Sequence, residues 1–78
     1  MPRIIITYET LFEVLKAEKA LKAHDEPFRV RPTPTPPFLS TSICGMSLEL
    51  LQAARKDEVV KYLKSLSLDP RGVHEVDT

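Results

Sequence analysis

The chain has 78 residues, and its eleven Lys and Arg balance eleven Asp and Glu without any block of like charge. A chain of this length buries only about 60% of the surface that its unfolded form exposes, so we expect one domain, residues 1–78, with a thin core and no large cofactor pocket. The balanced charge argues against nucleic acid as the main partner, because nucleic-acid binding needs clustered basic residues.

The first elements are a strand and a helix. The stretch RIIITY, Arg3–Tyr8, is short and β-branched, which is typical of a buried strand. Thr10 and Glu13 then have the spacing of a capping box, in which a hydroxyl and a carboxylate satisfy free N–H groups at a helix start. We expect this helix to run to about Ala23, with its apolar stripe formed by Leu11, Val14, Leu15 and Leu21.

The stretch FRVR, Phe28–Arg31, alternates apolar and basic residues and predicts a half-exposed strand. A Pro/Thr/Ser-rich loop is expected next, at about residues 32–42. Prolines remove backbone donors, so Pro32, Thr33, Pro34, Thr35 and Pro36 cannot form an interior strand, and we expect an extended path over the surface.

The second half of the chain allows two interpretations. Propensity alone favours one helix from about Ser47 to Leu66. The alternative, which we favour, is a strand at about Ile43–Leu51 followed by a helix at about Asp57–Leu66. A last strand is predicted at Arg71–Val76. The order is then β-α-β-β-α-β, an α+β fold of the ferredoxin-like type, with two helices on one face of a four-stranded antiparallel sheet.

The single cysteine, Cys44, is the candidate functional residue. As a thiolate it would be a nucleophile, with Ser40, Thr41 and Ser42 as hydroxyl donors and Gly45 leaving room for close approach. No general base is evident, which favours a carrier or redox role over hydrolysis. The alternative is a small buried hydrophobe. One cysteine excludes an internal disulfide framework, and with two distant histidines it predicts no metal site.

The elements ITYET, LKAEKALK, PFRVRPTP and STSICGMSL follow one another in an order that resembles the family of small bacterial domains called "putative selenium/sulfur carrier protein-like". The resemblance covers nearly the whole chain and places Cys44 at the family's carrier position. Either Pro32-Thr33-Pro34 or Pro34-Thr35-Pro36 takes the place of the family's Pro-Thr-Pro triplet. Two departures are the missing arginine after that triplet and Ile43 before the cysteine.

Two functions therefore remain open. The first is a sulfur or selenium carrier, in which Cys44 is loaded by a donor protein and emptied by an acceptor protein, without a cofactor or turnover of its own. The second is a small interaction or regulatory module in which Cys44 is structural. We expect a cytoplasmic protein, because the chain has neither a membrane-length apolar run nor a signal-peptide pattern. A homodimer is compatible with either function.

Overall fold

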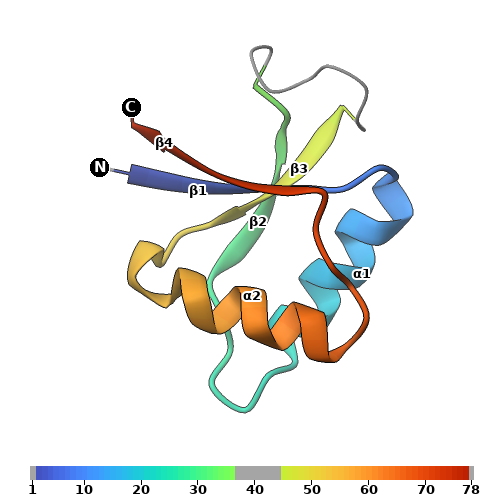
Figure 1. Cartoon of the computed structure of the whole chain (residues 1–78), viewed down its shortest axis with the longest axis vertical. Helices are drawn as coiled ribbons and strands as arrows, with labels where there is room; N and C mark the ends of the chain where they lie inside the picture. Colours follow the sequence, from blue (N-terminus) through green and yellow to red (C-terminus); the bar gives the residue numbers. More distant parts are fainter. Residues whose placement is uncertain (1, 37–44, 78) are drawn as a thin grey trace.

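The computed structural model describes residues 2–36 and 45–77. Along the chain they form two helices, four strands and one short 3-10 turn (Figure 1). The elements are β1 (Pro2–Thr7), α1 (Leu11–Lys22), β2 (Val30–Pro34), β3 (Met46–Leu50), η2 (Ala53–Arg55), α2 (Lys56–Ser65) and β4 (Gly72–Asp77). The predicted α+β class and the order of strands and helices along the chain are confirmed.

The four strands form one sheet in the order β2-β3-β1-β4, and every neighbouring pair is antiparallel. In β3, Leu48 lies opposite Ile6 of β1 on one side and opposite Pro32 of β2 on the other. The single-helix alternative for residues 47–66 is therefore wrong. Backbone hydrogen bonding to strands on both sides outweighs the helix propensity of Leu and Glu, which is a weak preference.

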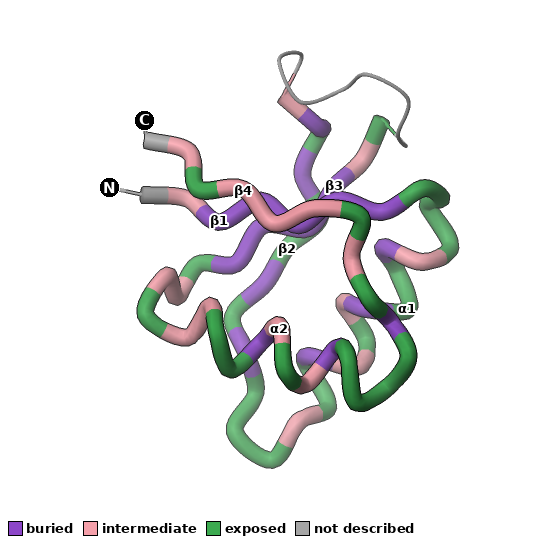
Figure 2. Tube along the Cα trace, in the orientation of Figure 1, coloured by how far each residue is buried: buried purple, intermediate pink, exposed green. Residues whose placement is uncertain are grey.

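One face of the sheet carries the hydrophobic core. Figure 2 shows that buried residues follow one another along β1 and β3. Ile4 and Ile6 of β1 and Leu48 and Leu50 of β3 share this face, because alternate residues of a strand point the same way. They pack in one cluster with the buried residues of both helices, which are Val14, Ala17, Leu21, Val59 and Leu63. Neither helix in the described part of the chain is long and apolar enough to cross a membrane.

Helix α1 begins as predicted, but its buried face differs from the predicted stripe. The Thr10 hydroxyl accepts a hydrogen bond from the Glu13 N–H at 3.2 Å and donates to the Glu13 carboxylate at 3.1 Å. Leu11 and Leu15, expected to be inward, are 46% and 48% exposed. Ala17 takes the inward position instead, since its small side chain lets the helix approach the sheet closely.

Strand β2 begins and ends later than predicted. It covers Val30–Pro34 rather than Phe28–Arg31, so Pro32, Thr33 and Pro34 belong to a strand and the expected loop cannot begin before Thr35. The prolines are tolerated because β2 lies at the edge of the sheet, where an N–H group is not required on the free side.

The end of α2 is fixed by a hydrogen-bond pattern that could not be predicted from the sequence. Ser67 has a left-handed backbone, with φ of 59°. The Ser67 N–H donates to the Lys64 carbonyl at 3.0 Å and the Leu68 N–H to the Leu63 carbonyl at 2.9 Å, which together form a Schellman motif. The Leu68 carbonyl in turn accepts from the buried Tyr8 hydroxyl at 2.7 Å, so this turn is fixed to the end of β1.

Replacing Ser67 with glycine should stabilise the protein, because glycine adopts a positive φ without a Cβ clash. We expect Ser67→Gly to raise the free energy of unfolding by about 0.5 kcal/mol, the left-handed strain less the extra entropy of glycine in the unfolded chain. Urea denaturation of the variant measures the change. Ser65→Gly, at the last residue of α2, where φ is not positive, is the matched control and should destabilise the protein. Equal loss of stability in both variants would contradict the left-handed strain at Ser67.

Candidate functional site

The predicted site residues fall into two groups. Cys44, Ser40, Thr41 and Ser42 lie outside the described residues. The structure does describe both chain segments that lead to them: Thr35 and Pro36 follow β2, and Gly45 immediately precedes β3. The site can therefore be built from its two flanks.

The two flanks are held together at their base. Pro34 lies opposite Met46 in the β2–β3 ladder, and the Thr35 N–H donates to the Gly45 carbonyl at 2.9 Å. The hydroxyl oxygens of Thr35 and Ser47 are 2.5 Å apart, and both residues are buried. We call Pro34, Thr35, Gly45, Met46 and Ser47 the loop stem. It fixes the residue that directly follows Cys44 beside the end of β2.

The two glycines of the chain, Gly45 and Gly72, differ in how closely other atoms surround them. A Cβ on Gly72 would lie 2.7 Å from the His74 Nε2 atom, so a larger residue there would require the His74 side chain to move. Among residues 2–36 and 45–77, no atom would lie within 4 Å of a Cβ on Gly45, and the φ angle of Gly45 is not positive. Gly45 is also exposed. Neither internal packing nor backbone conformation therefore demands glycine at the position next to Cys44.

Exposed apolar side chains lie at the same end of the sheet as the loop stem. Strands β1 and β3 are antiparallel, so the end of β1, which leads into α1, lies beside the start of β3 (Figure 1). The first turns of α1 expose Leu11, Phe12 and Leu15, and Phe12 is 72% exposed. We call these three residues the α1 apolar patch. Contiguous exposed apolar surface marks a contact site for another molecule more often than chance.

The sheet face opposite the core carries a charged cluster that sequence analysis missed. The Glu49 carboxylate, 3% exposed, accepts from Arg3 Nε at 2.9 Å and from Arg3 Nη2 at 3.0 Å. It also accepts from Arg31 Nε at 3.2 Å. Arg3 and Glu49 are separated by 46 residues, and only the β1–β3 pairing brings them together. The charge of Arg31 is therefore directed at Glu49.

The pKa of the Glu49 carboxyl lies below its ordinary value. The hydrogen bonds from Arg3 lower this pKa most, and those from Arg31 add to the effect, against burial, which raises it. A carboxyl with a depressed pKa in the folded state stabilises the fold at pH values above its unfolded pKa, about 4.3. That contribution is lost as the pH falls through the folded pKa.

Glu49→Gln should therefore lower the free energy of unfolding at pH 7 by about 1 to 3 kcal/mol, because it removes charge-assisted hydrogen bonds from a buried acceptor. It should also flatten the fall in melting temperature that the parent shows below about pH 4. Glu18→Gln, which removes an exposed pair with Lys22, is the control and should change the free energy by about 0.5 kcal/mol at most. Identical melting curves for Glu49→Gln and the parent at pH 7 would contradict this role.

The described residues offer no resident metal centre: within residues 2–36 and 45–77, no three His, Cys, Asp or Glu side chains gather closely enough to hold an ion. The chemistry available at the loop stem consists of hydroxyl groups, backbone amides and the thiol that the sequence places next to Gly45.

Comparison with known proteins agrees with the resemblance seen in the sequence. No curated protein and no solved structure is significantly similar to the chain. The model of the family described as "Putative Se/S carrier protein-like" matches residues 3–75, which is nearly the whole chain. This chain belongs to the Se/S carrier protein-like family.

Proposed function

We propose that the protein carries a sulfur or selenium atom on Cys44. The match of the family model over residues 3–75 is the observation that carries this proposal, because the family is described as "Putative Se/S carrier protein-like" and the chain has one cysteine that could hold the transferred atom. The loop around Cys44, with Ser40, Thr41 and Ser42 before it and Gly45 after it, is the proposed site.

The loading step needs no cofactor and no change in net oxidation state. The Cys44 thiolate attacks the terminal sulfur of a donor persulfide, R–S–SH, and forms the Cys44–S–SH persulfide. The donor sulfur–sulfur bond breaks and its electron pair leaves with R–S⁻. A selenosulfide donor, R–S–SeH, is attacked at selenium in the same way. Unloading repeats the step, with an acceptor thiolate as the attacking group and Cys44 as the leaving thiolate.

Three described features support this chemistry. The loop stem holds Gly45 in place through the Thr35 N–H, so the chain on the β3 side of Cys44 is anchored to the sheet. No atom of the described part of the chain would contact a side chain at Gly45, which suits a reaction that requires a second sulfur atom to approach along the S–S axis. The α1 apolar patch lies at the same end of the sheet and is a suitable contact surface for donor and acceptor proteins.

The fold also fits a carrier that docks on its partners. We propose that the sheet is ferredoxin-like: its order, β2-β3-β1-β4, places β3 between β1 and β2, as a split β-α-β unit requires. We further propose a cytoplasmic location, where the thiol of Cys44 stays reduced between transfer events. In the alternative function, an interaction or regulatory module, the same surface would bind a partner, Cys44 would be structural, and Cys44→Ser would leave the function largely intact.

Brief exposure of the folded protein to inorganic polysulfide should add one sulfur atom to Cys44, because an exposed thiolate attacks sulfane sulfur readily. Intact-mass and peptide mass spectrometry detect the adduct, and dithiothreitol should remove it. Cys44→Ser is the control, with an unchanged melting temperature and no adduct. Failure of the folded parent to take up sulfur, when the unfolded parent does so, would refute the carrier function and favour the interaction module.

Gly45→Val should slow transfer from a protein donor but not from a small one, since the added side chain occupies space that only a large partner needs. With persulfidated serum albumin as the model donor, we expect the loading rate to fall about tenfold, a steric cost of about 1.4 kcal/mol. Loading by polysulfide should stay within about twofold of the parent. Ala54→Val, at an exposed residue beyond the other end of β3, is the control for bulk. Equal slowing with both donors would contradict this steric role and would mean that Gly45 is needed for the conformation of the loop.

A further inference from the structure

The two edges of the sheet are unlike one another, and the β2 edge is closed to further pairing. In the β2–β3 ladder the Thr35 N–H donates to Gly45, and the Leu51 N–H donates to Arg29. Hydrogen-bonded and non-bonded pairs alternate along an antiparallel ladder, so the backbone groups of Pro32 and Pro34 point to the free edge. Proline has no N–H, and an added strand would find no donor at either position.

The β4 edge has no such protection. Strand β4 pairs with β1 alone, and no other described strand lies beyond it. Its sequence, GVHEVD, contains no proline. An unprotected edge presents a row of alternating N–H and C=O groups, which another strand can use.

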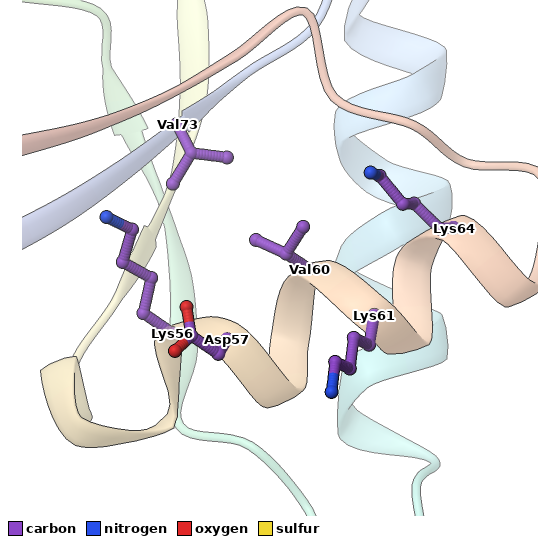
Figure 3. A pocket seen from close by; sticks show the side chains of 6 residues that line it. All are labelled: Lys56, Asp57, Val60, Lys61, Lys64 and Val73. Atoms are coloured by element: carbon purple, nitrogen blue, oxygen red, sulfur yellow. The ribbon is translucent and has the colours of Figure 1, made fainter.

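A basic groove runs beside this edge (Figure 3). Val73 of β4 and Val60 of α2 line it, together with Lys56, Lys61, Lys64 and Asp57, and it has a volume of about 510 Å³. Lys56, Val60 and Lys64 recur every fourth residue and so form one flank of α2. None of the three lysines forms a salt bridge within residues 2–36 and 45–77, and the groove is left with excess positive charge.

Strand β4 itself carries a group that complements the groove. Val73 lies opposite Ile6 and Glu75 lies opposite Ile4, so Val73 and Glu75 are on the helix face of the sheet. Glu75 is exposed and forms no salt bridge in the described part of the chain. A strand added to β4 runs about 4.8 Å away and places its helix-face side chains over the groove.

We propose that two copies of this chain associate through their β4 strands, paired antiparallel about a two-fold axis at His74, with Glu75 of each copy in the lysine groove of the other. In this register Val73 lies opposite Glu75 of the partner, and both are on the helix face, as the pleat requires. The single axis makes both grooves and both carboxylates equivalent, so each interaction occurs twice.

A second copy fits this edge better than an unrelated strand does. The six residues of β4 supply everything that the contact needs: the free edge, Val73 at the groove, and the Glu75 carboxylate for the lysines of the groove. The chain has no net charge at pH 7, so two copies meet without long-range repulsion. This inference does not depend on the proposed carrier function, because it uses no residue of the loop stem or of the loop that contains Cys44.

Sedimentation velocity of the full chain with Cys44→Ser, from about 1 µM to about 1 mM, tests the proposal without interference from disulfides. We expect reversible dimer formation as the concentration rises. Glu75→Lys should weaken the association about tenfold, since it places a cation against lysines. Combining Glu75→Lys with Lys56→Glu and Lys64→Glu should restore it, because the charges are exchanged. Lys19→Glu, on an exposed residue of α1, should leave it unchanged.

Three outcomes would overturn the proposal: a monomer at every concentration, an unchanged dimer in Glu75→Lys, or no recovery in the charge-exchanged variant. Melting curves of each variant verify that it is folded. Hydrogen exchange provides a second readout that does not rely on substitution. Amide protection within Gly72–Asp77 should rise with protein concentration, whereas protection of Val30–Pro34 should not.

Discussion

The antiparallel pairing of β3 with both of its neighbours is the constraint on which the rest of the structure depends. Pairing with β1 brings Ile4 and Ile6 beside Leu48 and Leu50, which creates the surface that both helices cover. Pairing with β2 places Gly45 against Thr35 and so fixes the chain on either side of the segment that contains Cys44. The same two pairings bring Arg3 and Arg31 to Glu49 on the opposite face.

Stability and proposed chemistry are thereby placed in different parts of the molecule. The core lies between the helices and one face of the sheet, and the Glu49 cluster occupies the other face. The loop stem is at the end of the sheet, where the Thr35 and Ser47 hydroxyl groups share a hydrogen bond and no described side chain crowds Gly45. In the proposed function, loading, emptying or replacing the cysteine of the neighbouring segment would therefore leave the core intact. A carrier that visits several partners needs this separation.

The elements with strong local signals could be predicted from the sequence. The β-branched run of β1, the threonine cap of α1 and the alternation of β4 each depend on neighbours in the chain, and the structure confirms all three. The inward face of α1 was predicted less well, because Leu11 and Leu15 are as apolar as Leu21 and only the position of the sheet decides which of them is covered. Strand β3 was the favoured interpretation even though the propensity of its Leu and Glu residues favours a helix. Its pairing partners in β1 and β2 are remote in sequence, so only the fold decides between the two.

The remaining features depend on contacts between residues far apart in sequence. In the sequence, nothing distinguishes Glu49 from an exposed carboxylate. Only the fold shows that Arg3 and Arg31 pair with it. Pro32 and Pro34 were assigned to a loop, because nothing local shows that their nitrogens point to a free edge of the sheet. Of the candidate site, the sequence supplied the cysteine and the glycine beside it. The anchoring of the stem and the open space at Gly45 required the fold.

The proposed function requires Cys44 to be an accessible thiolate in the folded protein, and the alkylation rate of Cys44 across about pH 5 to 10 measures this. We expect labelling by iodoacetamide under native conditions, with an apparent pKa below the free-cysteine value of about 8.5. The rate should be at least equal to that of the same chain in denaturant. Labelling that occurs only as fast as the protein unfolds would contradict the account, since it would show that Cys44 is packed inside the structure.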